Sequence, residues 1–479
     1  MAGGVNDKTH KMLINNKWVK TDKSLVVLNP FDNAPVGSVY LAGDREFSGA
    51  IGAAEMAFHE IRRMPGHERA GIIENAARTI NERAEALAVI ISKEAGKPIK
   101  DARLEVKRTA NTFRIASEEA KRIGGEVIPL DLFAGSEGRI GIVRRFPIGV
   151  VLGITPFNFP LNLVAHKVAP AMASGNSIII KPASKTPLSA LLLGDIISRA
   201  GWPAGGVNVV PCPGLVAEAA LRDERIRKLT FTGSASVGWR LKGLCAEKKV
   251  TLELGGNAGV IIDDGADIGF AAKRCAMGAF SYAGQICISV QRIYAQKRIF
   301  KKFKDAFLEN CAKLKLGDPL REDTDIGPMI DEASAIEAEK RVKEAVSKGA
   351  RIIFGARRRG GLFPPTVITD TAPDMAVCAE EMFAPVAALE AFERFEDAVK
   401  EVNRGPFGLQ AGVFTRDTQK VFYAYEELNV GGVVINDVPT YRVDHMPYGG
   451  VKKSGFGREG VRYSIEEMTE MKLLALKPF

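Results

Sequence analysis

Cys287 is the side chain of this 479-residue chain best placed to act as a nucleophile. It lies in the segment Ala283-Gly284-Gln285-Ile286-Cys287-Ile288, between a predicted helix and a predicted strand, and a glycine-bearing turn leaves a thiol accessible. A buried packing cysteine is the alternative. That role is expected of the other five, which lie beside proline, in predicted helices or in acidic surroundings: Cys212, Cys245, Cys275, Cys311 and Cys378.

Two other side chains have the chemistry to assist such a nucleophile. Glu253 ends an apolar strand before Gly255 and Gly256, which would keep it uncrowded, and burial there would raise its pKa toward that of a general base. Asn158 lies in a predicted strand-to-helix turn, where its amide could donate to a developing oxyanion. An ordinary ion pair for Glu253 and a helix cap for Asn158 remain alternatives.

Histidine and cysteine usage argues against two other chemistries. A Cys–His hydrolase is not favoured, because none of the five histidines stands in a recognisable base motif. The cysteines form no CxxC pair, so neither a disulfide framework nor a metal site is predicted. The histidines are His10, His59, His67, His166 and His445.

Gly233 and Gly238 indicate a phosphate-binding turn. They lie between an apolar strand (229–232) and a helical stretch (239–248), and a helix N-terminus after a strand directs amides at a phosphate. The spacing is G-x4-G and not the complete dinucleotide fingerprint, so an ordinary tight turn stays open. Lys181 ends a second apolar strand at the same predicted sheet edge, where open α/β sheets bind ligands.

Two α/β units would position these residues. Near-continuous apolar strands alternate with helices over residues 148–232, which is typical of a parallel sheet covered on both faces. The alternation starts afresh after residue 256. The predicted fold class is α/β, with a doubly wound parallel-sheet nucleotide-binding domain, a second α/β catalytic domain and a small β oligomerisation arm. The predicted bounds are 1–124 and 147–255, then 256–450, then 125–146 and 462–479 for the arm.

The pattern of apolar residues also predicts individual elements. In the first unit, alanine-rich helices are expected at 44–63, 67–95 and 97–123. In the second unit, strands are expected at 260–262, 291–295, 352–354 and 413–414, and helices at 268–283, 300–314, 334–347 and 395–403. The arm segments are rich in strand formers, and protruding strands need partners, so a homodimer or homotetramer is predicted.

Composition excludes several classes of protein. Lys+Arg 66 against Asp+Glu 57 leaves a net charge of only +9, and the dense basic run 357–359 precedes two glycines, so it indicates a solvated loop and no nucleic-acid partner. No apolar run approaches the ~18 residues of a membrane helix. Residues 1–20 lack the apolar stretch of a signal peptide, so a cytoplasmic location is expected.

Taken together, these segments resemble the aldehyde dehydrogenase family over nearly the whole chain, in the family's order and approximate spacing. The resemblance implies that Cys287 attacks the aldehyde carbon, and that the Asn158 amide and the Cys287 backbone N–H hold the oxyanion. Hydride then passes to nicotinamide, and Glu253 activates the water that hydrolyses the thioester. The matching segments are Thr155–Pro160, Lys181–Pro187, Phe231–Gly238, Leu252–Gly256, Gly284–Cys287, Glu381–Pro385 and Pro447–Gly457.

The resemblance also implies NAD or NADP as cofactor. Where NAD-preferring relatives often carry glutamate, this chain has Ser184, which cannot repel a 2′-phosphate, so both cofactors stay open. The family's usual glycine after Phe383 is Ala384 here, which puts the local turn in question. The implied contacts are Lys181 to the adenosine ribose, Gly233 and Ser234 to the pyrophosphate, and Glu381 and Phe383 to the nicotinamide riboside, with Thr155, Pro156, Ser184, Gly238 and Leu254 nearby.

The expected substrate pocket is polar. Asn162 and His166 follow Asn158 at i+4 and i+8 and so share one helix face, which is apolar in relatives that oxidise fatty or aromatic aldehydes. A polar face turned to solvent is the alternative. Arg108, and Arg442 with His445, are similar to the substrate-phosphate arginines of non-phosphorylating glyceraldehyde-3-phosphate dehydrogenases and to the lactaldehyde dehydrogenase branch.

The residue before the nucleophile narrows the expected substrate. The phosphate-specific enzymes usually carry an arginine there, and this chain has Ile286. A small hydroxylated or singly charged aldehyde is therefore expected, with lactaldehyde, glycolaldehyde and glyceraldehyde ahead of succinate semialdehyde. The rivals are a phosphorylated-aldehyde dehydrogenase, a coenzyme-A-acylating dehydrogenase, whose members generally lack the glutamate found at Glu253, and an inactive binding protein on the same fold.

Overall fold

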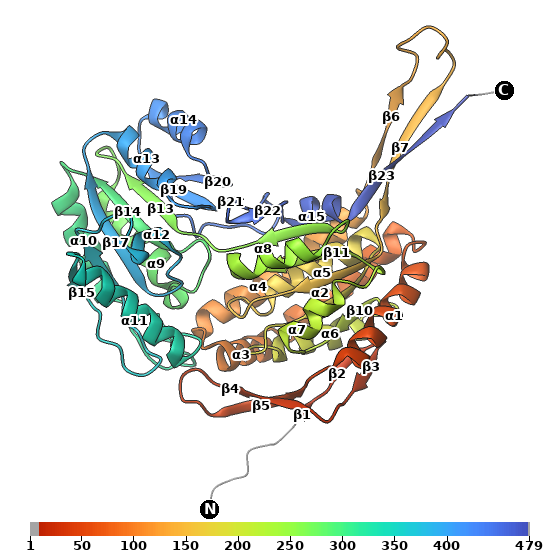
Figure 1. Cartoon of the computed structure of the whole chain (residues 1–479), viewed down its shortest axis with the longest axis horizontal. Coiled ribbons are helices and arrows are strands. Elements are labelled where there is room, and N and C mark those ends of the chain that lie inside the picture. The colour runs from red at the N-terminus through yellow and green to blue at the C-terminus, as the bar shows by residue number, and fades with distance from the viewer. Residues whose placement is uncertain (1–8, 478–479) are drawn as a thin grey trace, which may run out of the picture.

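The computed structural model describes residues 9–477 as two α/β lobes and a projecting β arm (Figure 1). The predicted fold class is confirmed. The predicted domain boundaries remain predictions, and residues 1–8 and 478–479, which they include, lie outside the described residues. Between residues 9 and 477, no helix is long and apolar enough to cross a membrane.

The first lobe is built on an eight-stranded sheet in the order β22-β12-β11-β8-β9-β10-β2-β3. The five central strands are parallel, and antiparallel strands close both edges. The central strands are β8 (Val150–Ile154), β9 (Ser177–Lys181), β10 (Val207–Val209), β11 (Ile226–Thr232) and β12 (Lys249–Glu253); the edges are β2 (Met12–Ile14), β3 (Lys17–Val19) and β22 (Gly455–Phe456).

Helices cover both faces of this sheet, as the continuous apolar strands predict. Because successive side chains point to opposite faces, Val151 and Ile180 pack into one core, and Leu152 and Ile179 into the other. The first core contains α2 (Gly66–Glu82), α3 (Ala84–Ala95), α4 (Ile99–Ala120), α5 (Asn162–Ser174), α6 (Leu188–Arg199) and α15 (Val461–Glu467); the second contains α1 (Asp44–Ile61), α7 (Gly214–Ala220) and α8 (Ala235–Leu244).

Several predicted helix bounds in this lobe are wrong. The predicted helix 67–95 is two helices, α2 and α3, that meet at Arg83, whose guanidinium reaches Asp195 on α6 at 3.4 Å. Neither glycine nor proline marks that break in the sequence. Helix α8 begins at Ala235, directly after the Gly233 turn, rather than at Trp239. Its N-terminal amides therefore lie closer to the predicted phosphate site than the sequence pattern suggested.

The second lobe contains a seven-stranded sheet in the order β15-β16-β17-β14-β13-β19-β20, parallel except for the β15–β16 pair. The sequence pattern missed β16, β17, β20, α12 and α14. Of these, β16, β20 and α12 have only four residues each, and β17 is alanine-rich. The strands are β13 (Ala258–Ile262), β14 (Val290–Gln296), β15 (Arg351–Phe354), β16 (Thr366–Thr369), β17 (Val386–Phe392), β19 (Gln410–Phe414) and β20 (Gly432–Ile435). The helices are α9 (Ile268–Phe280), α10 (Phe300–Ala312), α11 (Glu332–Ser347), α12 (Ala376–Ala379), α13 (Phe395–Arg404) and α14 (Thr418–Glu427).

The arm is an antiparallel sheet in the order β23-β7-β6 that projects from the first lobe (Figure 1). Its strands are β6 (Gly125–Pro129), β7 (Ile140–Pro147) and β23 (Thr469–Leu476). Within the predicted arm segment 462–479, residues up to 467 belong to α15, which packs on α5, and the arm strand β23 begins at Thr469. Two small sheets join β1 (Thr9–His10), β5 (Pro35–Tyr40) and β4 (Ser24–Leu28), and β18 (Phe407–Gly408) with β21 (Val451–Lys452).

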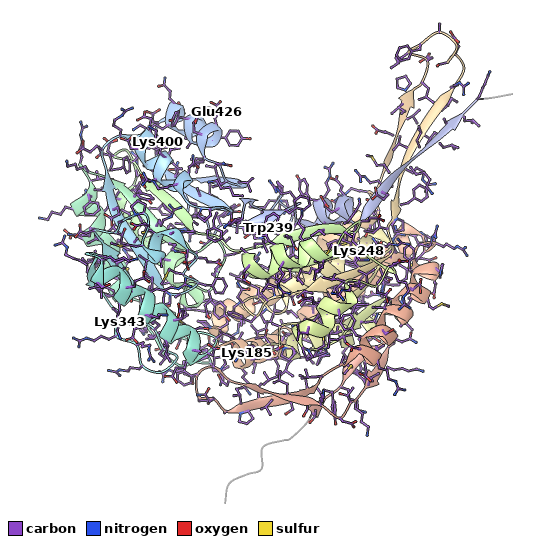
Figure 2. The ribbon with its side chains drawn as sticks, in the orientation of Figure 1. Lys185, Trp239, Lys248, Lys343, Lys400 and Glu426 are labelled. Carbon is purple, nitrogen blue, oxygen red and sulfur yellow. The ribbon has the colours of Figure 1, made fainter. Side chains whose placement is uncertain are left out.

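Basic side chains are spread over both lobes. Figure 2 shows Lys185 and Lys248 on the first lobe and Lys343 and Lys400 on the second. Lys343 and Lys400 are both more than 70% exposed, at 72% and 74%, and each lies within 4 Å of a carboxylate on its own helix. The absence of a nucleic-acid partner remains a prediction.

Candidate active site

A cavity of about 410 Å³ lies between the two lobes and brings together most of the predicted site residues. The first lobe contributes residues that follow β8, β11 and β12, and the second lobe contributes the cysteine turn. The predicted residues that line it are Arg108, Pro156, Asn158, Asn162, Gly233, Ser234, Glu253, Leu254, Cys287, Glu381, Phe383 and Arg442. The predicted residues outside its lining are Thr155, His166, Lys181, Ser184, Gly238 and His445.

A strained turn holds Cys287 in the cavity. Helix α9 ends at Phe280, before the predicted residue 283, because Tyr282, Ala283 and Gly284 have left-handed φ values of 48°, 53° and 67°. The Tyr282 hydroxyl donates to the Ala95 carbonyl at 2.7 Å and ties the turn to the first lobe. A β-carbon at Gly284 would lie 2.2 Å from the Ala384 carbonyl oxygen, so a side chain cannot replace this glycine.

The turn around Ala384 accommodates the departure from the family's usual glycine. The left-handed φ of this segment falls on Phe383, at 48°, and Ala384 is not among the described residues with positive φ. The Ala384 methyl group is buried in the core of the second lobe. An alanine at this position therefore requires no left-handed backbone.

The Cys287 thiol is half-buried and contacts a tyrosine. The Tyr448 hydroxyl lies 3.0 Å from Cys287 Sγ, so it can donate to a thiolate. Burial raises the pKa of Cys287 to about 11, and this hydrogen bond opposes the rise. The resting side chain is therefore a thiol at neutral pH. The remaining five cysteines are buried, as predicted.

Asn158 is placed beside the cysteine turn. Its Nδ2 donates to the carbonyl oxygen of Gln285 at 2.9 Å, and this carbonyl lies two residues before Cys287. A side-chain amide carries two N–H donors, so one remains for an oxyanion. The Gln285 side chain is itself fixed, because its Oε1 accepts from the Ile330 amide at 2.8 Å.

Glu253 ends β12 inside the cavity, as a buried carboxyl group. Neither of its oxygens has a hydrogen-bond partner among the described residues. Burial, together with the nearby charge of Glu459, raises its pKa well above the ordinary value. A β-carbon at Gly449 would lie 2.9 Å from Glu253 Oε1, so Gly449 is the glycine that leaves room for this side chain.

The expected purpose of Gly255 and Gly256 is wrong. A β-carbon at Gly255 would lie 2.1 Å from Glu381 Oε2, and one at Gly256 would lie 2.3 Å from the Cys287 carbonyl oxygen. The Gly256 amide donates to Glu381 Oε1 at 3.0 Å. The glycines thus admit Glu381 and the backbone of the cysteine turn, which approach from the second lobe.

A buried ion pair lies next to Glu253. Lys167 Nζ donates to Glu459 Oε1 at 2.8 Å, and both side chains are at most 2% exposed. Arg442 Nη2 lies 3.9 Å from Glu459 Oε2, and the Arg442 guanidinium lies 3.6 Å from the centroid of the Tyr448 ring. The sequence analysis did not identify Lys167, Glu459 and Tyr448 as site residues. Only their contacts with one another and with Arg442 in the folded chain mark them as part of the site.

The predicted nucleotide-binding residues gather at one edge of the first sheet. The register pairs Ile154 with Lys181 and with Phe231, and Thr232 with Glu253, so β8, β9, β11 and β12 end at the same level. Strand order reverses between β8 and β11, and open α/β sheets bind ligands in the crevice at such a point.

The residues at this edge fit a dinucleotide. Ser234 is the N-cap residue of α8 without a side-chain cap, so the first amides of the helix remain free for an anion. Lys181 is half-buried at the end of β9, and Ser184 is exposed. Gly238 has a packing role, because a β-carbon there would lie 2.3 Å from Leu254 Cδ2. Thr155 Oγ1 is buried without a hydrogen-bond partner in the described chain.

The predicted substrate residues are only partly brought together. Arg108, Asn162 and Arg442 line the cavity, whereas His166 is buried behind it and His445 is exposed at the surface. The structure therefore does not bring His445 to the cavity. The polar face of α5 does not turn to solvent either, because Asn162 and His166 are buried and both hydrogen bond to Asp444.

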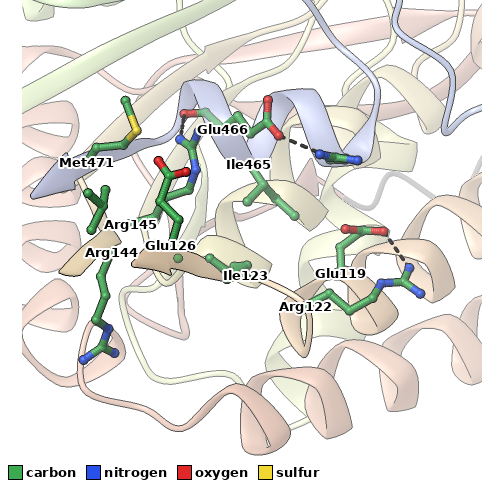
Figure 3. A pocket seen from close by; sticks show the side chains of 13 residues that line it. Glu119, Arg122, Ile123, Glu126, Arg144, Arg145, Ile465, Glu466 and Met471 are labelled. Atoms are coloured by element: carbon green, nitrogen blue, oxygen red, sulfur yellow. Dashed lines mark hydrogen bonds and ion pairs between the residues drawn. The ribbon is translucent and has the colours of Figure 1, made fainter. Parts of the chain in front are cut away.

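A larger cavity, of about 680 Å³, lies at the base of the arm and contains none of the predicted site residues (Figure 3). Two of its arginines are paired with carboxylates: Arg122 donates to Glu119 at 2.6 Å, a contact drawn in Figure 3, and Arg462 donates to Glu466 at 3.2 Å. Its lining contains no cysteine.

Comparison with known proteins identifies the family. The model of the aldehyde dehydrogenase family matches residues 18–474. The chain belongs to the aldehyde dehydrogenase family. It is 42% identical over 470 residues to a 3-sulfolactaldehyde dehydrogenase of Priestia aryabhattai (98% of both chains), and 38% identical over 468 residues to a lactaldehyde dehydrogenase of Methanococcus aeolicus (97% and 99%).

Solved structures of the family superpose closely. Aldehyde dehydrogenase 21 of Physcomitrella patens, in complex with its reaction product succinate, has a TM-score of 0.97 and 44% identity over 99% of both chains. The glyceraldehyde-3-phosphate dehydrogenase GapN of Methanocaldococcus jannaschii, complexed with NADP, has a TM-score of 0.92 and 38% identity over 96% of this chain and 100% of that one. The predicted family and enzyme class are thus confirmed.

Proposed function

We propose that this aldehyde dehydrogenase uses NAD or NADP to oxidise a small aldehyde carrying a single negative charge to its carboxylic acid. The observation that carries the proposal is Arg442. Its guanidinium lines the cavity that holds Cys287, yet it makes no hydrogen bond to any residue between 9 and 477. A buried guanidinium without a hydrogen-bond acceptor is costly, and a substrate anion would supply the acceptor.

The charges around the cavity favour a substrate with a single negative charge. Arg108 is bound by Asp444 at 2.7 Å, and Lys167 by Glu459 at 2.8 Å, so each of these cations has a carboxylate. The raised pKa of Glu253 favours its uncharged form. Arg442 lies 3.9 Å from the same Glu459, so Lys167, Arg442 and Glu459 together keep one net positive charge, which a carboxylate or sulfonate on the substrate would meet.

The chain's own residues can carry out the covalent steps. Cys287 gives its thiol proton to solvent water, and the thiolate Sγ bonds to the aldehyde carbon. The carbonyl π electron pair moves to oxygen, where Asn158 Nδ2 and the Cys287 backbone N–H donate to it. When bound, the nicotinamide cofactor accepts a hydride. Glu253 then takes a proton from water, whose oxygen bonds to the acyl carbon of the thioester, and Cys287 leaves as a thiolate.

The relatives support a small, polar substrate. These relatives include sulfolactaldehyde, lactaldehyde and succinate-semialdehyde dehydrogenases, and one solved neighbour holds succinate. Lactaldehyde is uncharged, so a small hydroxylated aldehyde is the second candidate, favoured by the polar Asn162 in the cavity lining.

A steady-state screen tests the proposal. We expect kcat/KM to be highest for succinate semialdehyde among lactaldehyde, glycolaldehyde, glyceraldehyde, glyceraldehyde 3-phosphate, succinate semialdehyde and a medium-chain aldehyde, each with NAD and NADP. Arg442→Gln should lower kcat/KM for the charged aldehyde at least tenfold more than for lactaldehyde. Preference for the medium-chain aldehyde, or an equal loss with both substrates, would refute the proposal. Acyl-coenzyme A in place of free acid would revive the acylating rival.

We also propose that the arm joins copies of this chain. Both edge strands of its sheet, β6 and β23, lack a neighbour in the described chain, and apolar side chains on them are exposed: Val127 at 72%, Leu473 at 52% and Leu474 at 56%. Such edges associate with other strands.

The molar mass of the assembly, measured by light scattering after size-exclusion chromatography, tests whether the arm joins copies of this chain. The native chain should run as a dimer or tetramer, and Leu474→Lys should shift it toward the monomer. Leu215→Lys is the matched control, because Leu215 is 78% exposed on α7, away from the arm. A monomeric native chain would refute this assignment.

A further inference from the structure

The carboxylate of Asp444 binds three of the groups that the sequence assigned to substrate recognition. Its Oδ1 accepts from Arg108 Nη2 at 2.7 Å and from Asn162 Nδ2 at 3.3 Å, and lies 2.9 Å from His166 Nε2. Its Oδ2 accepts from Arg108 Nε at 3.3 Å. The contact with Arg108 is therefore two-pronged, which fixes the plane of the guanidinium.

Asp444 itself is not placed to meet a substrate. Its side chain is 4% exposed and lies outside the cavity lining, whereas Arg108 is 22% exposed and belongs to that lining. Asp444 therefore acts on the cavity through Arg108. The segment that carries it, between β20 and β21, also carries Arg442. One loop therefore presents Arg442, which has no hydrogen bond in the described chain, and neutralises Arg108.

We propose that Asp444 is a specificity-determining positioning residue: by neutralising Arg108 it leaves Arg442 as the cation for the substrate, and so selects singly charged over doubly charged aldehydes. This inference rests on the proposed function, because it assumes that Arg442 receives the substrate anion. A second free guanidinium in the cavity would instead favour a dianion such as a phosphate ester.

The surroundings of Asp444 keep it ionised. Burial opposes ionisation, but the hydrogen bond from His166 and the charge and hydrogen bonds of Arg108 hold the pKa of Asp444 well below its usual range. Burial and the charge of Arg442 lower the pKa of His166, so its ring stays neutral and adds no charge to balance. The neutralisation of Arg108 thus persists across the working pH range.

Asp444→Asn tests the inference, because the amide keeps the size and can still accept from Arg108 while the charge is lost. The readout is the ratio of kcat/KM for glyceraldehyde 3-phosphate to that for succinate semialdehyde, measured in the full-length enzyme at constant ionic strength. We expect this ratio to rise about tenfold, which corresponds to about 1.4 kcal/mol. An unchanged ratio in a folded variant overturns the inference.

Two further variants complete the test. Asp437→Asn is the matched control, because Asp437 also binds an arginine, Arg274, at 2.6 Å but does not line the cavity, and it should leave the ratio unchanged. The double variant Arg108→Gln with Asp444→Asn removes both charges and leaves neither partner buried alone. It should return the ratio to the native value, and it also answers the question if Asp444→Asn fails to fold. A double variant whose ratio differs from the native value by tenfold overturns the inference.

Failure of the proposed function would look different. It would appear in the native enzyme, as a preference for lactaldehyde or for the medium-chain aldehyde over succinate semialdehyde. The change in ratio caused by Asp444→Asn is measured against the native ratio and does not depend on which aldehyde is preferred.

Discussion

Replacing Tyr448 by phenylalanine should make the Cys287 thiol harder to ionise. The Tyr448 hydroxyl lies 3.0 Å from Cys287 Sγ and opposes the effect of burial, which raises the pKa of Cys287 to about 11. Phenylalanine keeps the ring on which the Arg442 guanidinium stacks at 3.6 Å, so the change removes little besides the hydroxyl.

The size of the effect follows from the hydrogen bond. A hydrogen bond to a charged group contributes about 1.5–3 kcal/mol, and about 1.4 kcal/mol corresponds to one pKa unit, so the pKa of Cys287 should rise by about 1–2 units. The thiolate fraction at pH 8 would then fall about 10- to 100-fold. A more basic thiolate is intrinsically more nucleophilic, with a Brønsted coefficient of about 0.4–0.5, so the observed alkylation rate should fall only about 3- to 15-fold.

The assay is inactivation of the cofactor-free enzyme by iodoacetamide between pH 7 and 9. Cys287→Ala identifies the labelled residue, since the other five cysteines are buried. A rate unchanged within twofold would show that the Tyr448 hydroxyl does not stabilise the thiolate. A faster rate would show that the hydroxyl instead accepts a hydrogen bond from the thiol and holds it protonated.

Three further predictions concern the same cavity. Gly256→Ala should lower kcat at least about 100-fold. The new β-carbon would lie 2.3 Å from the Cys287 carbonyl oxygen, and displacing a reacting group by about 1 Å lowers the rate by this amount. Gly243→Ala is the control in the same kinetic assay, because a β-carbon at Gly243 would have no atom within 4 Å. Asn158→Ala should lower kcat about 10²- to 10³-fold with little change in KM, through loss of an oxyanion donor, and a change confined to KM would contradict this. Only the carboxylate form of Glu253 accepts a proton, and the pKa of Glu253 is raised. The rate of thioester hydrolysis should therefore increase with pH over a range that lies well above pH 4.5. Glu253→Gln should abolish that increase while an initial burst of NAD(P)H survives; stopped-flow absorbance separates the two steps.

Local sequence patterns were sufficient for the elements and for the residues that lie directly at their ends. The continuous apolar strands of 148–232 must be buried on both faces, so they predicted a parallel sheet with helices on either side. Glu253, Gly233 and Lys181 each follow or end such a strand, and the parallel register brings them to one edge. The break between α2 and α3 was missed because Arg83 contacts Asp195, which is distant in the sequence, and such a contact leaves no local signal. Strand β17 was missed because its alanine-rich sequence is not distinctive of a strand.

Which charges are free could be decided only by the tertiary structure. The sequence analysis assigned both Arg108 and Arg442 to substrate recognition. Their neighbours in the sequence do not reveal which of the two is neutralised by a carboxylate. The fold places Asp444 within 2.7 Å of Arg108, 336 residues away in the chain, and leaves Arg442 without a hydrogen bond in the described chain. The same holds for Tyr448 and Cys287, which are 161 residues apart and meet at 3.0 Å. The sequence alone determined which chemical groups are present and at which strand ends they lie. Their pairing, and so the charge that remains for a substrate, depends on distances across the cavity between the lobes.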